Sequence, residues 1–179
     1  MTELSHGLSG ASGEYYAAAE LARRGFIATI TNRNAEGIDI LAAKPCSGRA
    51  IKIQVKTIQG VTKRWVLREK SEKVYGEGYF YIFVRLGALG VRPTFHIVPG
   101  KVVAEAIKAE HAKWVGGVKR DGSARKNSSM RKFSDKTGDY LEKWEFLEEE
   151  ANQALLPTST VVTPAADAPV APTAAAADL

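Results

Sequence analysis

The clearest alternation of apolar and polar side chains runs from residue 50 to residue 57. In an extended chain, successive side chains point to opposite faces, so this stretch predicts a strand with one apolar and one polar face. The apolar face carries Ile51, Ile53 and Val55, and the polar face carries Lys52, Gln54 and Lys56.

Shorter apolar runs predict further strands on either side of this one. Residues 26–30 and 38–43 precede it, residues 79–84 and 94–98 follow it, and residues 65–67 are a further candidate. Pro45 to Gly48 is a turn-like stretch, so we expect residues 38–43 and 50–57 to form a hairpin.

Two stretches carry helical periodicity. The first is predicted to begin with Ser12 as its N-cap and to end at Gly25. The second follows Pro99 and Gly100 and runs to about residues 111–115. The order of helix, strands, strand and helix favours an α/β fold with a mixed central sheet flanked by helices.

The last part of the chain has a different composition. Residues 151–179 are rich in Ala, Pro and Thr and contain no aromatic residue and no glycine, with four prolines spaced so as to block a helix. We therefore expect one domain over residues 1–150, followed by a disordered tail without a catalytic role.

Composition narrows the class of protein. A chain of 179 residues is long enough for one domain with a substantial core. No apolar run approaches the length of a membrane span, and the N-terminus lacks the pattern of a signal peptide. The single cysteine, Cys46, excludes an internal disulfide, so we expect a cytoplasmic protein.

The charge is concentrated in the predicted domain. The whole chain carries +5, but residues 151–179 hold two acidic residues and no basic one, which leaves residues 1–150 at +7. A basic domain is compatible with a polyanionic partner such as nucleic acid, although solubility alone is an equal explanation.

Polar side chains interrupt the apolar pattern where the predicted hairpin brings its strands together. Asp39 lies between Ile38 and Ile40, and the turn places it opposite Gln54 and Lys56. A carboxylate in an apolar strand is costly unless it is paired, so Asp39 requires a metal ion or a cationic partner.

The chemistry that such a group would serve is phosphodiester hydrolysis, in which a metal lowers the pKa of water and neutralises charge on the phosphate. Mg²⁺ prefers oxygen ligands and keeps several waters, so we expect Mg²⁺ or Mn²⁺. Asp39 would be the main ligand, joined by the side-chain oxygen of Gln54 and the backbone carbonyl of Val55. Lys56 would orient the attacking water or stabilise the developing anion. Glu14, in the first turn of the predicted helix, would bind through a water or complete a second metal position.

Three motifs carry a family resemblance: Gly13-Glu14, Gly37-Ile38-Asp39-Ile40 and Ile53-Gln54-Val55-Lys56-Thr57. Their order and spacing resemble the PD-(D/E)XK nuclease superfamily, and within it the Holliday-junction-resolvase-like and Mrr-like branches. The resemblance covers about residues 9–100. It implies a restriction-endonuclease-like α-β-β-β-α-β core with a metal-dependent DNA-cleaving site at Glu14, Asp39, Gln54 and Lys56. The remainder, including residues 128–133, resembles a bacterial family of uncharacterised proteins that share this core.

Gln54 departs from the usual family pattern, which has an acid here, and an amide binds Mg²⁺ more weakly than a carboxylate. Two functions therefore stay open. One is a metal-dependent DNA endonuclease in repair, recombination or defence, and the other is a non-catalytic nucleic-acid-binding or interaction module with the same fold. Asp39 and Lys56 could instead form an ion pair without metal, and Glu14 could serve only the helix dipole. Many nucleases with one site per chain act as dimers, so a homodimer also stays open.

A second basic feature lies between residues 113 and 136, where eight basic residues face two acidic ones among interleaved Gly, Ser and Asn. This composition predicts a mobile loop that contacts phosphates, with a solvated charged surface as the alternative. The expected DNA-contacting residues are Lys52, Lys119, Arg120, Arg125, Lys126, Arg131 and Lys132. We assign Trp65, Trp114 and Trp144 to core or edge packing, and no histidine pair has the spacing of a metal site.

Overall fold

The computed structural model describes residues 4–32, 37–45, 49–60, 62–73 and 76–153. Its elements are, in order, α1 (His6–Arg23), β1 (Ile27–Ile30), β2 (Ile40–Ala43), β3 (Ala50–Ile58), β4 (Trp65–Arg68), the 3-10 helix η1 (Glu69–Glu72), β5 (Tyr79–Arg85), β6 (Thr94–Pro99), α2 (Gly100–Val115), β7 (Met130–Phe133) and α3 (Glu145–Asn152).

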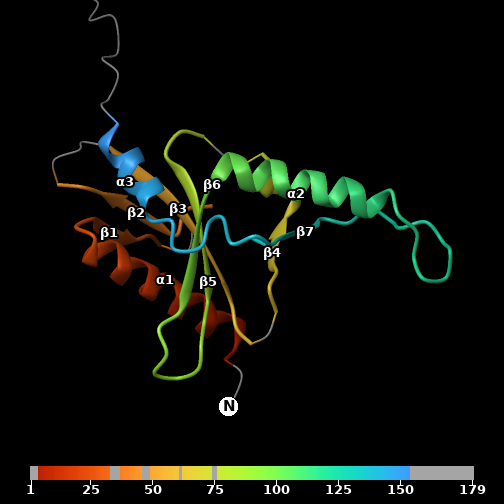
Figure 1. Ribbon diagram of the computed structural model, residues 1–179, viewed down its shortest axis with the longest axis horizontal. Coiled ribbons are helices and arrows are strands. Elements are labelled where there is room, and N and C mark those ends of the chain that lie inside the picture. Colours follow the sequence, from red (N-terminus) through yellow and green to blue (C-terminus); the bar gives the residue numbers. More distant parts are fainter. Residues whose placement is uncertain (1–3, 33–36, 46–48, 61, 74–75, 154–179) are drawn as a thin grey trace, which may run out of the picture.

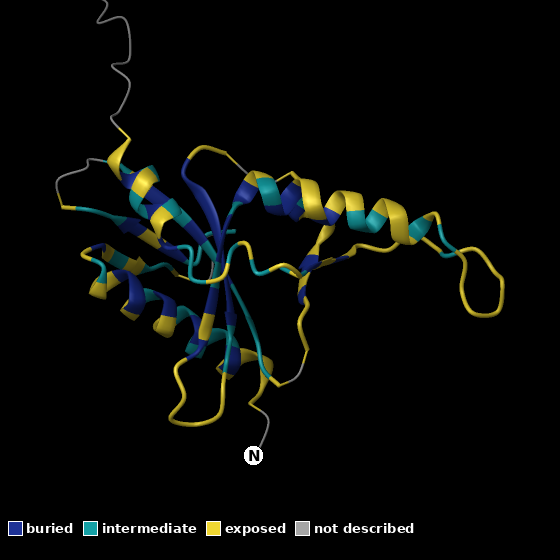
Figure 2. Cartoon of the chain, in the orientation of Figure 1, coloured by how far each residue is buried: buried dark blue, intermediate teal, exposed yellow. Residues whose placement is uncertain are grey.

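Five strands form a mixed sheet in the order β1-β2-β3-β5-β6. The neighbours β3 and β5 run parallel, and the other pairs are antiparallel. Six of the seven residues of β5 are buried, because helices or a smaller sheet cover both of its faces (Figure 2). The predicted fold class, a mixed central sheet flanked by helices, is confirmed.

Each face of this sheet has its own apolar layer (Figure 1). On one face, α1 and α3 pack over a core that includes Leu21, Ile53 and Leu147. On the other face, α2 and the two-stranded sheet β4–β7 cover a second core around Tyr81 and Phe83. The polar residues of β3 lie on this second face, since Gln54 is in register with Tyr81 and parallel neighbours share a face.

Only one strand of the two-stranded sheet β4–β7 is predicted from the sequence. Residues 65–67 were expected to be a strand, but the partner strand β7 lies where we predicted a mobile loop. Its inward residue Phe133 stacks on Phe83 with ring centroids 4.5 Å apart, and Trp65 of β4 lies 5.0 Å from the same ring. Aromatic packing therefore fixes β7 against the main sheet.

The first helix begins earlier than predicted. Its N-cap is Ser5, whose side chain accepts a hydrogen bond from the backbone N–H of Leu8, and Ser12 lies inside the helix. Glu14 is consequently in the middle of α1 and not in its first turn. The explanation of Glu14 as a residue that serves the helix dipole therefore fails, because that effect fades within the first turn.

The connection from β3 to β5 also differs from the α-β-β-β-α-β order. The described residues between these parallel strands form β4 and the short helix η1, where an α-helix was expected. At the other end, α3 continues to Asn152 and buries Ala151, two residues into the segment predicted to be a tail. Residues 154–179 of that prediction lie outside the described part of the chain. Within the described part, every helix is too short or too polar to cross a membrane.

Candidate active site

The β2–β3 hairpin places Asp39 directly beside the polar face of β3. The two strands pair with Ile40 opposite Ile53, and the backbone N–H of Asp39 donates to the carbonyl of Ile53 at 2.8 Å. Asp39 itself lies one residue before β2, where its carbonyl accepts from the N–H of Thr31 at 2.9 Å. Backbone hydrogen bonds on both sides therefore fix the position of this carboxylate.

The Asp39 carboxylate points at β3. Its Oδ2 accepts hydrogen bonds from Gln54 Nε2 at 2.9 Å and from the backbone N–H of Val55 at 2.7 Å. The ladder with β2 ends at Ile53, so the backbone of Val55 lies just beyond it. In an antiparallel ladder, the N–H and C=O of one residue point to the same side. The carbonyl of Val55 therefore points to the side of β3 on which Asp39 lies.

Lys56 follows on the same face of β3 and is half-buried. Burial lowers the pKa of Lys56 below its ordinary value of 10.5, and the nearby charge of Lys70 lowers it further. The carboxylates of Asp39 and Glu14 act in the opposite direction and favour the charged amine. The Asp39 carboxylate thus attracts Lys56 electrostatically, while its own hydrogen bonds come from Gln54 and Val55.

Glu14 reaches this region because α1 lies unusually close to β3. A Cβ atom added to Gly13 would lie 1.9 Å from Oγ1 of Thr57, the residue after Lys56. Only a glycine permits this approach without displacing the strand or the helix. The motif Gly13-Glu14 thus has a physical explanation, since the glycine brings the glutamate within electrostatic reach of Lys56.

Tyr79 belongs to the same cluster, although no pattern in the sequence indicates it. Its hydroxyl donates to the carbonyl of Gly37 at 2.8 Å and lies 3.5 Å from Gln54 Oε1. Burial, with further contributions from Tyr81 and Asp39, raises the pKa of Tyr79, so the phenol stays protonated. In the sequence, Tyr79 opens an apolar run and resembles any core residue. Here its hydroxyl supports both Gly37, two residues before Asp39, and the amide of Gln54.

The oxygen donors of the cluster fit a small, hard cation. Within the described segments, no group of three His, Cys, Asp or Glu side chains is arranged to hold a metal. A metal would therefore depend on mixed donors, namely the Asp39 carboxylate, the Gln54 amide oxygen, the Val55 carbonyl and Glu14. Gln54 now presents its amide nitrogen to Asp39, and a half-turn of that amide would present Oε1 instead. Carboxylate, amide and carbonyl oxygens together suit Mg²⁺ or Mn²⁺.

The predicted DNA-contacting residues divide into two groups. Lys52 lies on the polar face of β3, and Lys119, Arg120, Lys126 and Lys132 are exposed. Arg125 is partly covered, and its guanidinium donates to the carbonyl of Trp114 at 3.0 Å. These positions are compatible with contact to a phosphate backbone.

Arg131 differs from that expectation. Its side chain is 3% exposed, pairs with Glu72 and Glu69, and donates to the carbonyl of Ser128 at 2.6 Å. A guanidinium with all of these partners is not available to a phosphate. Arg131 therefore serves to join β7 to η1.

A hollow of about 460 Å³ lies away from the Asp39 site. It is lined by Glu20, Arg23, Arg24 and Arg92. Its charges are mutually satisfied: Glu20 pairs with Arg24 at 2.5 Å and with Arg92 at 2.9 Å. Arg92 also pairs with Glu142 at 2.9 Å. We call Glu20, Arg24, Arg92 and Glu142 the Glu20 cluster. Because its charges are already paired, we assign it to holding α1 against the β5–β6 loop and the segment before α3.

Comparison with known proteins adds little to this picture. No protein-family model and no curated protein matches the sequence. Among solved structures, the chain is similar to a bacterial homing endonuclease, I-Ssp6803I, at 14% sequence identity and a TM-score of 0.49. The alignment covers 82% of this chain and 94% of the endonuclease. A functional proposal must therefore rest on the side chains of this chain.

Proposed function

We propose that the protein is a metal-dependent DNA endonuclease of the PD-(D/E)XK kind, acting in repair, recombination or defence. One observation carries the proposal. The Asp39 carboxylate is held against Gln54 and Val55, with the half-buried Lys56 next on the same strand face. An acid, an amide and an amine with a lowered pKa, gathered where the β2–β3 pairing ends, are groups that phosphodiester hydrolysis can use.

Asp39, the amide oxygen of Gln54 and the carbonyl of Val55 would hold Mg²⁺ or Mn²⁺, with Glu14 binding through a water or at a second position. When bound, the ion supplies Lewis-acid chemistry, activating water and neutralising charge on the phosphate. Gln54 takes the place of a carboxylate, so the site carries one negative charge fewer than the usual pattern. We therefore propose a weaker affinity for the metal than that of an acid-containing site.

Lys56 supplies the remaining charge. Burial lowers its pKa, so the charged form of Lys56 is less favoured than that of an exposed lysine, and the side chain can donate hydrogen bonds in either form. It would orient the attacking water and stabilise the anion that develops on the phosphate. Tyr79 acts as a positioning residue, since its hydroxyl contacts Gly37 and Gln54 and not the site of reaction.

Basic side chains would hold the DNA backbone. Lys52 lies on the same strand face as Gln54 and Lys56, and Lys132 lies on β7, which covers that face of the sheet. Lys119, Arg120, Arg125 and Lys126 extend the positive charge away from the sheet. Contacts of this type fix the register of a nucleic acid without reading its sequence.

A cleavage assay tests the proposal directly. Purified protein with Mg²⁺ or Mn²⁺ should nick or cut plasmid DNA, and EDTA should stop it. Asp39→Ala and Lys56→Ala should each lower the rate by at least about 100-fold, with unchanged circular dichroism. Lys101→Ala, which removes an exposed lysine on α2 outside the site, is the matched control and should cleave normally. Full activity in both site variants would show that the proposed site is wrong.

A second function is favoured by one observation, the neutral Gln54 in place of an acid. The protein could bind nucleic acid without cleaving it. DNA binding that weakens steeply with salt, combined with absent cleavage at every metal concentration, would support this alternative. Gln54→Glu separates the two, because a gain in metal affinity or cleavage would place residue 54 among the metal ligands.

A further inference from the structure

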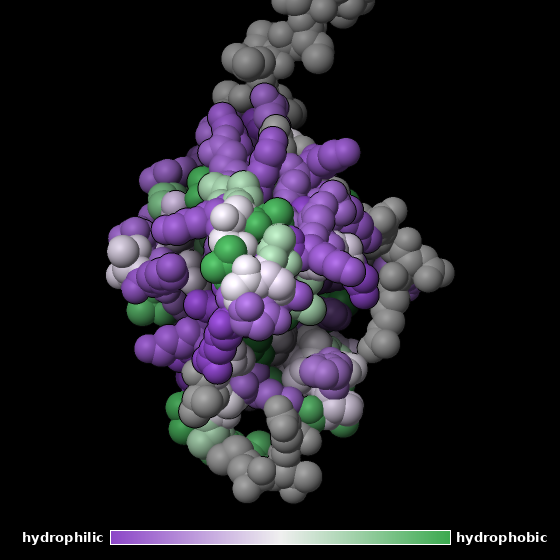
Figure 3. Space-filling view, turned by 90° about the vertical axis from the view of Figure 1, so that its right-hand side faces the viewer, coloured by the Kyte–Doolittle hydropathy of each residue, from purple (hydrophilic) through white to green (hydrophobic). Residues whose placement is uncertain are grey.

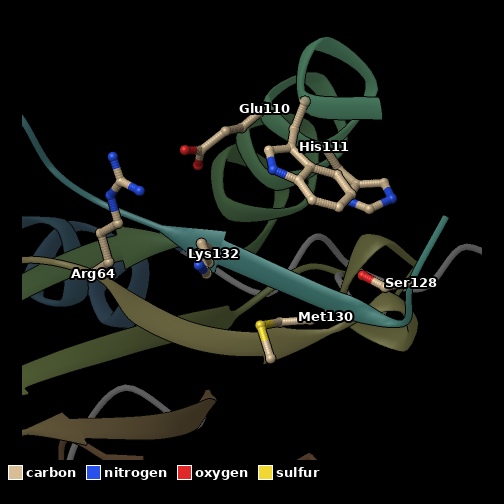
Figure 4. A pocket seen from close by; sticks show the side chains of 7 residues that line it. Arg64, Glu110, His111, Ser128, Met130 and Lys132 are labelled. Atoms are coloured by element: carbon tan, nitrogen blue, oxygen red, sulfur yellow. The ribbon is translucent and has the colours of Figure 1, made fainter. Parts of the chain in front are cut away.

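A small pocket lies between the last turns of α2 and the β4–β7 sheet (Figure 4). Its volume is about 140 Å³, well below that of clefts which take drug-sized ligands. It is lined by Arg64, Glu110, His111, Trp114, Ser128, Met130 and Lys132. None of these residues belongs to the candidate active site, but α2 and β7 cover the same face of the main sheet as Gln54 and Lys56.

The pocket has an exposed aromatic wall. Trp114 is 42% exposed, whereas Trp65 and Trp144 are almost fully buried, so Trp114 lies at the edge of the packing and the other two lie inside it. The His111 ring stacks on Trp114 at 5.7 Å, and its Nε2 lies 2.8 Å from Asn127 Oδ1. Arg125 lies over the indole at 5.2 Å. These contacts fix the rings before any ligand arrives, which lowers the entropic cost of stacking on them.

The charges of the pocket fit a nucleobase better than a phosphate. Arg64 and Lys132 are exposed cations, but Glu110 places a carboxylate among them. In Figure 4, the Glu110 carboxylate and the Arg64 guanidinium end on the same side of the pocket, and the His111 ring ends on the other. A carboxylate repels a phosphate but accepts hydrogen bonds from the amino and imino groups of a base. The two cations are then free to contact the phosphates on either side of that base.

A basic hairpin adjoins the pocket. Val118 pairs with Ala124, and Lys119 accepts from Gly122 and donates to Ser123, which tightens the turn between them. Asp121 accepts from both the N–H and the hydroxyl of Ser123. Residues 118–124, which lie within the predicted mobile loop, thus form a hydrogen-bonded turn that projects from the end of α2 (Figure 1). Figure 3 looks towards this end of the molecule, where hydrophilic side chains gather around a small apolar strip.

We propose that this pocket, which we call the Trp114 pocket, binds an unpaired base of a single-stranded stretch of DNA, packed against the exposed part of the Trp114 indole with its edge at Glu110. The proposal rests on the proposed nuclease function, and it narrows the substrate class to DNA with a flap, an overhang or an open junction. In a paired duplex the bases are stacked on one another and cannot enter a pocket of this size. Aromatic platforms beside basic side chains are the usual means of holding single strands.

Binding is measured in EDTA, so that cleavage does not interfere, by fluorescence anisotropy of a labelled duplex with a single-stranded overhang and of the same duplex with blunt ends. The wild type should bind the overhang DNA more tightly. Trp114→Ala should lower affinity for the overhang DNA by about 5- to 100-fold and leave blunt-duplex affinity unchanged. Tyr16→Ala, which removes an aromatic side chain of similar exposure from α1, should change neither. Lys119→Ala should weaken the binding of both substrates alike, because the exposed Lys119 is proposed to contact phosphate and no base.

Tryptophan fluorescence gives a second measurement that needs no variant. Trp65 and Trp144 are buried, so an unlabelled oligonucleotide that stacks in the pocket should quench chiefly Trp114. Equal affinity of wild type and Trp114→Ala for overhang DNA, or an unquenched Trp114 at saturating oligonucleotide, would overturn the proposal. If the Trp114 effects appear but metal-dependent cleavage does not, the pocket stands and the nuclease proposal falls. If metal-dependent cleavage appears without the Trp114 effects, the pocket proposal is wrong and the nuclease proposal is retained.

Discussion

Two charged clusters that share helix α1 differ in whether their surroundings favour the charged forms of their side chains. In the Glu20 cluster each charge has a partner, and hydrogen bonds from Arg92 and Arg24 lower the pKa of Glu20 to about 2. At the Asp39 site the balance is reversed, because burial lowers the pKa of Lys56 in spite of the nearby acids. The first cluster is thus stabilised in the charged form that it has at neutral pH, whereas at the second site burial acts against the charged form of Lys56.

This difference in charge balance distinguishes a structural cluster from a candidate functional site better than the volume of a hollow does. The larger hollow lies at the Glu20 cluster, where paired charges leave little to offer a substrate. The Asp39 site contains an amine that is costly to keep charged, and such groups are found where a protein performs chemistry. Proteins commonly give up stability at functional sites, and that trade can be measured here.

The largest expected change in stability comes from a substitution in α1, the helix that carries both Glu14 and Glu20. Gly13→Ala would place a methyl group against Thr57 and should destabilise the protein by about 1–3 kcal/mol. It should also lower cleavage, because Glu14 moves away from Lys56. Urea denaturation and the plasmid assay measure the two effects.

Gly10 provides the matched control on the same helix, because an added Cβ there meets nothing within 4 Å. Gly10→Ala should stabilise the protein by about 1 kcal/mol through helix propensity and leave cleavage unchanged. Thr57→Ala added to Gly13→Ala should restore part of the lost stability. Equal effects of the two glycine substitutions would refute the close approach of α1 to β3.

A smaller effect is expected at the Glu20 cluster. Arg92 is 46% exposed, so water screens its ion pairs, and Arg92→Ala should cost about 0.5–1 kcal/mol at pH 7. The pKa of Glu20 is lowered from 4.5 to about 2, so its stabilisation is complete above pH 4.5 and is lost as the pH falls towards 2. The difference between wild type and Arg92→Ala should shrink over that range. Arg23→Ala, at a more exposed partner of Glu20, should have little effect at any pH.

The smallest expected change in stability concerns Lys56, where stability and cleavage should change in opposite directions. Lys56→Met keeps the length of the side chain and removes its charge, so it should raise the melting temperature at pH 7 while abolishing cleavage. Below its lowered pKa, wild-type Lys56 is charged in both the folded and unfolded states, and the cost of burying it is complete. As pH rises through that pKa towards 10.5, the unfolded chain binds more protons and the wild type gains stability.

The advantage of Lys56→Met should therefore decline at alkaline pH, which thermal denaturation at a series of pH values would show. A lower melting temperature for Lys56→Met at pH 7 would mean that Asp39 and Glu14 outweigh burial. The Asp39 site would then be an ion-pair network like the Glu20 cluster.

The sequence predicted the hairpin at the site because its signals are local. Alternation along β3 assigned Gln54 and Lys56 to one face, and the turn before it set which residues lie opposite Asp39. The start of α1 was missed for an equally local reason, since Gly7 and Gly10 favour helix poorly. That turn is helical because Ser5 caps it and Ser9 is buried, which is a tertiary effect.

The remaining errors concern contacts between segments that are far apart in the chain. β7 forms because β4 pairs with it, and Arg131 is withdrawn from solvent because Glu72 lies across that pairing. The sequence of residues 130–133 alone does not indicate that β4 and Glu72 contact them. α3, which the sequence did not reveal, likewise owes its position to Leu147 and Ala151 in the first core.

The pairing of β4 with β7 has a practical consequence for dissecting the molecule. A fragment that stopped after α2 would lack β7, leaving β4 with a bare row of backbone donors and acceptors and uncovering the apolar side of Trp65 and Leu67. Such an edge recruits strands from other molecules, so the shortened polypeptide should aggregate. Expression of residues 1–115, which carry the Asp39 site, would require a replacement strand, supplied as a fused or added peptide.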